Sequence, residues 1–447
     1  MLAPDSIPKQ TLLLHALALI LIQGSFTALQ FTLPIVVRKH LDGGKWEVTL
    51  ITAAPLVLAV ASILWHGLQA RWSLRRSVTI YWAVACAPLL AMAAVMWAPN
   101  LSDSARYWAM ASCWILCSLG TAGWAPIAGE MLRRLYPTKS RGFVYGILTM
   151  AWMGAGAAAS ASVGQTLSTS VKYLPAILLT ACSFQALGCI LLASIGRRGP
   201  ITSPLNVPAN SATISAANAE SVITDPSAPS TDPAKSFAQS LRDFLAPILH
   251  AGEILRSDRV FARYEAAFMT YGIGWMICYA LVPLLITDQL KLSYDDAAEN
   301  SHVVFLLINL LATVPAGLLT DRLGPARVCT AAFFVYALYP IALIFVATKL
   351  HLASASIVYG LAAAAVNAGW MLGPVALAPT AEKASHYVAI HTTMVGFRGG
   401  VFMFLGTGLY ALTGSFIAPL AIAAAGFLFA AIQMWNLESA MTARMKK

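Results

Sequence analysis

The chain has 447 residues, of which 58% are hydrophobic and only 11% are charged. Soluble globular proteins carry about 25% charged residues, so this composition excludes a soluble globular fold and indicates that most of the surface meets lipid. The formal net charge of +10 would suggest nucleic-acid binding in a soluble protein, but membrane topology explains it better here.

Charge-free segments long enough to cross a bilayer follow one another along the chain. A hydrocarbon core of about 30 Å takes about 20 helical residues. The first segment lies between Lys9 and Arg38, and the next are residues 48–70, 77–102, 107–129, 142–171 and 173–196. The second part of the chain contains residues 266–287, 300–320, 328–348 and 350–381, and the stretch 384–437 is long enough for two further spans. The pattern predicts an all-α membrane protein with twelve transmembrane helices, six in each half.

A polar segment separates the two groups of helices. Residues 199–235 are rich in Pro, Ser, Ala and Asn, which is typical of a flexible linker. Residues 236–257 place apolar side chains at helical spacing. This spacing predicts either an amphipathic helix on the inner membrane surface or a short cytoplasmic helix without lipid contact. We therefore divide the chain into a first bundle (1–198), a linker region (199–260) and a second bundle (261–447).

The basic residues determine the expected orientation. Most Lys and Arg residues fall in connecting segments on the same side as the N-terminus. Because cytoplasmic loops carry an excess of positive charge, both termini are predicted to be cytoplasmic, in the cell (inner or plasma) membrane. The basic residues therefore need no nucleic-acid partner, and we expect a monomer in the lipid bilayer.

The sequence offers no pattern for covalent chemistry or for a cofactor. The seven cysteines fall in predicted spans without a C-x-x-C pair, so packing explains them better than a metal site does. No nucleophile with a neighbouring base and no phosphate-binding loop is present. We therefore expect a protein that is not an enzyme.

The two halves contain similar short motifs in the same order. Leu33–Val36 in the first span matches Val282–Leu285 in the seventh, and Ala122–Trp124 in the fourth matches Ala368–Trp370 in the tenth. Many transporters are built from such repeats around a central site. The matches therefore favour a duplicated transporter architecture.

The loop after the eighth span carries a recognisable motif. It reads G-L-L-T-D-R-L-G-P-A-R from Gly317 to Arg327 and resembles the signature G-x-x-x-D-R-x-G-R-K of the major facilitator superfamily. The resemblance covers essentially the whole chain. It implies two pseudo-symmetric six-helix bundles and transport by alternating access. It also implies that Asp321 helps to close the cytoplasmic side against the start of the fifth span near Arg141; the alternative is a solvated loop that only sets topology.

The first-half copy of this loop departs from the pattern. It reads G-L-Q-A-R-W-S-L-R-R from Gly67, with Arg71 in place of the acid. Glu382 could pair with Arg71 or Arg75, which would keep the interaction with its charges exchanged. The residues expected to act in gating are Gly67, Arg71, Arg75, Arg141, Gly317, Asp321, Arg322, Gly324, Arg327 and Glu382.

Polar and aromatic residues occur on the spans that line the cavity in this superfamily, the first, fourth, seventh and tenth. The expected substrate-binding residues there are Gln23, Thr27, Gln30, Trp124, Tyr271, Trp275, Tyr279, Asn367 and Trp370. Such walls suit a partly apolar organic solute held by a few hydrogen bonds. Each of these side chains could equally well pack between helices.

Arg398 is a charged residue in the middle of the eleventh span. A charge at the bilayer centre costs at least about 2.5 kcal/mol and usually has a function. No acid is expected at its depth, because Glu130 and Glu265 lie toward the cytoplasmic ends of their spans. Arg398 therefore predicts either binding of an anionic substrate or a structural contact with backbone carbonyls. His391, on the same helix face, could relay a proton or pack as a hydrogen bonder.

The resulting hypothesis is transport of a small organic solute, anionic or amphipathic, bound at the midplane. The alternatives are proton-coupled efflux of drug-like compounds and a sensor that keeps the fold without transport. Spans 1, 4 and 7 lack a midspan carboxylate, and the fifth span lacks the antiporter signature G-x-x-x-G-P-x-x-G-G. These absences weigh against drug–proton antiport and leave a coupling proton as an open alternative.

Overall fold

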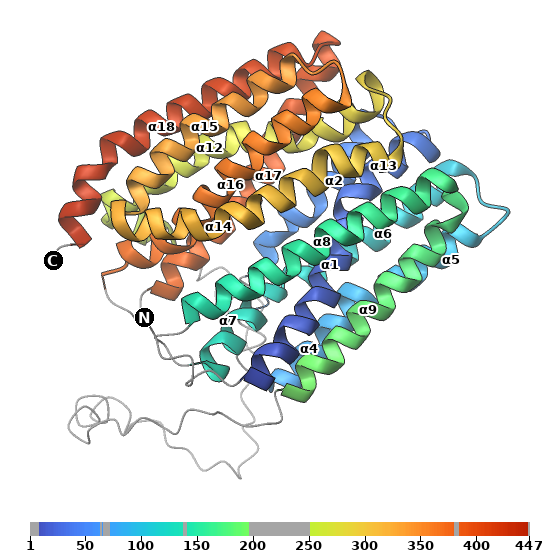
Figure 1. The fold of residues 1–447 in the computed structure, drawn as a ribbon, viewed down its shortest axis with the longest axis horizontal. Coiled ribbons are helices and arrows are strands. Elements are labelled where there is room, and N and C mark those ends of the chain that lie inside the picture. The colour runs from blue at the N-terminus through green and yellow to red at the C-terminus, as the bar shows by residue number, and fades with distance from the viewer. Residues whose placement is uncertain are drawn as a thin grey trace, which may run out of the picture.

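The protein is described by a computed structural model that covers residues 9–62, 65, 72–136, 141–195, 251–379 and 384–445. All regular secondary structure in these residues is helical. The helices form two groups packed side by side, coloured blue to green for the first half and yellow to red for the second (Figure 1). The two predicted six-helix bundles correspond to these groups.

The helices follow one another in chain order within each half. The first half contains α1 (Lys9–His40), α2 (Lys45–Val57), η2 (Leu58–Ala61), α4 (Leu74–Tyr81), η3 (Trp82–Cys86), α5 (Pro88–Trp97), α6 (Asp103–Thr121), α7 (Trp124–Leu135), α8 (Arg141–Thr169), η5 (Val171–Tyr173) and α9 (Leu174–Ile195). The second half contains α12 (Arg259–Leu284), η7 (Leu285–Gln289), α13 (Tyr294–Ala297), η8 (Ala298–Val303), α14 (Val304–Leu323), α15 (Pro325–Ile344), α16 (Lys349–Leu377), α17 (Ala384–Thr413) and α18 (Ile417–Met445).

Helices occupy each of the twelve predicted spans. Within the described residues, ten helical segments are long and apolar enough to cross a membrane. The second and fourth spans are not among these ten. Helix α2 and η2 lead into residues outside the described part, and a turn at 122–123 separates α6 from α7. The linker 199–235 and most of the expected amphipathic helix 236–257 also lie outside the described residues, but 251–257 are helical.

Each half has its own buried core. In the first half, Trp114 of α6 is completely buried and donates from Nε1 to the carbonyl oxygen of Ile51 at 2.9 Å. In the second half, Phe268 of α12 packs edge to face against Phe333 of α15, with the ring centres 5.4 Å apart. Helix α1 begins and α18 ends at the same end of the bundle (Figure 1). This placement is expected when the number of spans is even.

Glycines allow the closest helix crossings in the second half. A Cβ added to Gly274 of α12 would lie 2.6 Å from the carbonyl oxygen of Ala423 in α18. Gly272, two residues earlier, faces α17, and the side chain of Arg398 occupies the space that a Cβ would take. Small residues of this kind let transmembrane helices gain van der Waals contact where lipid offers no hydrophobic driving force.

Candidate functional site

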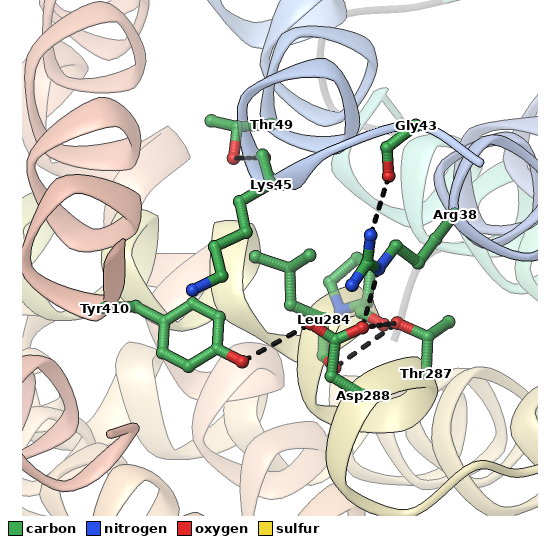
Figure 2. Close-up of polar contacts among 9 residues, drawn as sticks. Arg38, Gly43, Lys45, Thr49, Leu284, Thr287, Asp288 and Tyr410 are labelled. Carbon is green, nitrogen blue, oxygen red and sulfur yellow. Dashed lines mark hydrogen bonds and ion pairs between the residues drawn. The ribbon is translucent and has the colours of Figure 1, made fainter. Parts of the chain in front are cut away.

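Polar contacts join the two halves at the end of the bundle opposite the start of α1, which we call the distal end. Arg38 of α1 donates from Nε to Oδ1 of Asp288 in η7 at 2.7 Å, and from Nη1 to the carbonyl oxygen of Gly43 at 3.0 Å (Figure 2). The hydroxyl of Tyr410 in α17 donates to the other carboxylate oxygen of Asp288 at 3.3 Å. Lys45 lies over the Tyr410 ring, 4.1 Å from its centre. Asp288 thus links α1 of the first half with α17 of the second.

Two further contacts extend this distal seam. Thr49 of α2 and Thr407 of α17 share a hydrogen bond of 2.6 Å and are both fully buried. Ser168 of α8 donates to Oδ1 of Asp295 in α13 at 2.6 Å. Among the side chains that the structure describes, ion pairs between the halves occur only at the distal end. These contacts hold the two halves together at the distal end.

Two π-helical turns carry residues that meet the first half. Turn η7 follows Pro283 and contains Asp288, and turn η8 precedes α14 and contains His302. Nδ1 of His302 lies 3.0 Å from the hydroxyl oxygen of Ser160 in α8, and its ring stacks on Phe31 of α1 with centres 4.6 Å apart. A π turn holds one residue more than an α turn and is frequent at functional sites.

A cavity of about 280 Å³ lies between the halves. The first half contributes Thr27, Gln30, Phe31, Pro34, Thr52, Leu56 and Trp152 to its lining. The second half contributes Trp275, Cys278, Tyr279, Val282, Pro283, Ser301, His302, Phe305, Leu306, Tyr339 and Tyr359. Pockets for small organic molecules typically show this combination of apolar and aromatic walls with a few polar groups.

Aromatic packing shapes the second-half wall of the cavity. Nε1 of Trp275 donates to the hydroxyl of Tyr359 at 2.9 Å. The Tyr359 ring stacks on both Phe305 and Tyr339, with ring centres 4.4 Å and 4.7 Å away. These mutual contacts hold the rings in place, so the wall is pre-formed.

A buried polar cluster lies inside the second half, outside this cavity. Nδ1 of His391 is 2.8 Å from Oε1 of Glu265, and both side chains are almost completely buried. Nη1 of Arg398, also buried, donates to the carbonyl oxygen of Phe268 at 2.6 Å. Phe268 lies one helical turn after Glu265 on α12, so Arg398 lies near the pair of Glu265 and His391. We call Glu265, His391 and Arg398 the second-half cluster.

The guanidinium of Arg398 lies nearer to Glu265 than the sequence positions of the two residues suggested. The long side chain reaches along α17 toward the level of Phe268, one helical turn from Glu265. The sequence position of Arg398 indicates where its α-carbon lies, whereas the guanidinium lies further along the helix. Of the two alternatives, the contact with a backbone carbonyl is the one that this geometry favours.

Comparison with known proteins determines the family. The sequence model of the Major Facilitator Superfamily matches residues 16–302, which is more than half of the chain. The chain belongs to the Major Facilitator Superfamily. It is therefore a multi-pass membrane transporter for small solutes and not an enzyme. A comparison with curated proteins finds no match.

Solved structures of several transporters match the fold over nearly the whole chain. A POT family transporter in complex with 5-aminolevulinic acid has a TM-score of 0.73 at 12% identity, covering 98% of this chain and 99% of that chain. A mutant peptide transporter POT in complex with alafosfalin has a TM-score of 0.71 at 13% identity, covering 99% and 98%. A mutant of the nucleoside transporter NupG has a TM-score of 0.62 at 13% identity, covering 97% and 99%. At these identities the likeness shows the fold alone.

In this superfamily member, only part of the predicted binding set lines the cavity. Thr27, Gln30, Trp275 and Tyr279 do so. The remaining predicted residues do not line it: Gln23, Trp124, Tyr271, Asn367, Trp370, His391 and Arg398. Trp124 packs on Tyr81 within the first half, and Tyr271 stacks on Phe333 in the second-half core. Trp124 and Tyr271 therefore pack between helices, which was the alternative to substrate binding.

Sequence reasoning missed several residues that line the cavity. These are chiefly Phe31, Trp152, His302, Phe305 and Tyr339. The one signal that could have identified His302 is that it is a titratable residue in an otherwise apolar span. The aromatic residues carry no such signal, because every face of a transmembrane helix is rich in apolar side chains.

The superfamily signature loop connects α14 and α15. Gly324 has a φ of 85°, a conformation that strains residues with a Cβ, so the turn requires glycine. Arg327 pairs with Glu438 of α18, which belongs to the same half. Asp321 and Arg322 are exposed and form no ion pair with any side chain in the described ranges. The contact expected of Asp321 across the halves stays a prediction, because the side chain of Arg141 lies outside the described residues.

The remaining gating predictions are only partly covered by the structure. Gly67, Arg71 and Glu382 lie outside the described residues, as does the side chain of Arg141. Arg75 is exposed, and an added Cβ on Gly317 would meet no atom within 4 Å. The pairing with exchanged charges therefore stays a prediction.

Proposed function

We propose that this transporter binds a small amphipathic organic solute in the central cavity and carries it across the membrane by alternating access. The observation that carries this proposal is that both halves line one cavity and are joined at the distal end by the contacts around Asp288. A transporter that rocks its halves around a fixed site needs these two features.

The distal end is proposed to face away from the cytoplasm. Basic residues are concentrated in the segments at the opposite end, where α1 begins and α18 ends (Figure 1). In this orientation the conformation is closed to the outside, and both termini are cytoplasmic in the cell membrane. A monomer suffices for this mechanism, because the site is formed within one chain.

An amphipathic solute is favoured over an anion. The anion hypothesis relied on an unpartnered Arg398, but this side chain is buried against Phe268 and lies outside the cavity. The cavity itself combines aromatic rings with neutral polar groups such as Gln30 and Ser301. These groups suit a molecule with an apolar body and a few hydrogen-bonding atoms.

If the transport cycle is coupled to a proton, the second-half cluster is the best candidate to bind this proton. Carboxylate and histidine side chains inside membrane spans commonly form proton relays, and Glu265 and His391 contact each other at 2.8 Å. Glu265→Gln should then abolish acceleration of flux by an inward proton gradient while leaving exchange of solute across the membrane. If the protein instead exports drug-like compounds, the same gradient should drive these compounds out of the vesicles.

A reversible lock on the distal seam tests alternating access. Thr49→Cys with Thr407→Cys places two thiols where the hydroxyl oxygens are 2.6 Å apart, within reach of a disulfide. The solute for the assay is first identified by a thermal-stabilisation screen across organic acids, sugars, nucleosides and drug-like cations. Oxidation should stop its flux into proteoliposomes, and reduction should restore it.

Each single cysteine variant serves as the control for oxidation. Flux that continues after complete cross-linking would contradict alternating access around this cavity. Binding of a solute without any flux in the reduced protein would favour the sensor alternative.

A further inference from the structure

The cavity contains no charged side chain among the described residues that line it. Arg38 and Asp288, at the distal seam, neutralise each other, and Arg398 is turned toward Phe268. A charged solute entering the cavity would lose its hydration without gaining a counter-charge. Such a buried unpaired charge costs several kcal/mol.

Several neutral polar groups in the cavity have no hydrogen-bond partner among the described residues. They are the amide of Gln30 and the hydroxyl of Thr27 in the first half, and the hydroxyl of Ser301 in the second. The Tyr359 hydroxyl accepts from Trp275 and keeps its own proton available to donate. Together these groups offer both donors and acceptors from both halves.

The walls around these groups are rich in aromatic rings. Trp152 of α8 lines the cavity and makes no ring contact with any described aromatic residue. In the second half, Tyr359 stands in a stack between Phe305 and Tyr339. Aromatic side chains from both halves, among them Phe31, Trp152 and Trp275, line the cavity and favour a planar aromatic guest by edge-to-face packing. The volume of about 280 Å³ is close to the lower limit of organic-ligand pockets.

We propose that the solute is a small, uncharged, planar heteroaromatic molecule whose ring-borne polar groups are bound by Gln30. This inference rests on the proposed function, since it specifies the substrate class of the same cavity. The Gln30 amide can donate to a carbonyl and accept from an N–H of the same solute. Binding of this solute therefore depends on hydrogen bonds and aromatic packing, with no ion pair.

Matched probes separate charge from shape. Nicotinamide is neutral and planar, nicotinate has the same ring with a negative charge, 3-(aminomethyl)pyridine carries a positive charge, and cyclohexanecarboxamide is neutral but not planar. Equilibrium binding to the purified full chain is measured by calorimetry and thermal stabilisation, without any transport step. Nicotinamide should bind at least about tenfold more tightly than each of the other three.

Equal or tighter binding of either charged probe would overturn the claim of an uncharged solute. Equal binding of cyclohexanecarboxamide would overturn the claim of planarity, and binding by none of the probes at millimolar concentration would overturn the proposal as a whole. Because the readout is binding alone, these outcomes are distinct from a failure of transport or of the distal-seam lock.

Two variants locate the binding site. Gln30→Leu should weaken nicotinamide binding by about tenfold, the usual value of one good neutral hydrogen bond. Gln433→Leu makes the same change in α18, away from the cavity lining, and should leave the affinity unchanged. Unchanged affinity in a folded Gln30→Leu protein would remove Gln30 from the site and contradict the proposal.

Discussion

Replacing Arg398 with glutamine tests whether this buried cation supports the structure or binds the solute. The native side chain is 1% exposed and donates to the Phe268 carbonyl oxygen at 2.6 Å. A hydrogen bond from a charged group contributes about 1.5 to 3 kcal/mol. Arg398→Gln should therefore lower the free energy of unfolding by about 1.5 to 3 kcal/mol.

Melting curves of the purified variants in detergent measure this loss. Arg263→Gln makes the same chemical change at an exposed position of α12 and should leave the melting temperature unchanged. Arg398→Lys should recover part of the stability, because an ammonium keeps the charge but not the guanidinium geometry. A glutamine variant that melts like the native protein but binds its solute more than tenfold more weakly would refute this reasoning and restore the anion hypothesis.

Two other substitutions test features of the second half. Gly272→Ala places a methyl group where the Arg398 side chain lies, so its melting temperature should fall by several degrees, whereas Gly317→Ala, with no atom within 4 Å, should change it little. At the start of α12, burial raises the pKa of Asp258, but hydrogen bonds led by that from Arg444 outweigh it and hold the pKa below its ordinary value of 3.8. Its contribution to stability is therefore present above pH 3.8 and is lost as the pH falls through the lower folded value. Asp258→Asn should be less stable than the native protein at pH 7. Urea or thermal unfolding at pH 3 should show a smaller difference in stability between the two proteins. An equal difference at both pH values would contradict this assignment.

The fold was largely predictable because charge is excluded from the bilayer core. Gaps between charged residues alone placed the twelve helices, and the loop from Gly317 to Arg327 indicated the superfamily. Within the site, the polar face of the first span correctly placed Thr27 and Gln30 in the cavity. A polar side chain in a membrane-spanning helix is unfavourable against lipid. It is therefore expected to face the bundle interior or a cavity.

The rest of the site could not be predicted for three physical reasons. Hydropathy does not distinguish a face that packs inside one half, such as that of Tyr271, from a face that lines the cavity, such as that of Tyr279. A long side chain reaches one or more turns from its α-carbon, as Arg398 does. Charges at helix ends, such as Arg38 and Asp288, look like ordinary topogenic residues until the tertiary fold brings them together.

The π turns at η7 and η8 make the distal seam sensitive to how the helices are wound. Each α-helical residue rotates the chain by about 100°, so rewinding a π turn into regular α-helix shifts the face on which the flanking side chains point by about that amount. In η7 this rotation would swing Asp288 away from Arg38, and in η8 it would separate His302 from Ser160. A slip of one residue within a single turn would then release contacts between the halves without any rigid-body movement.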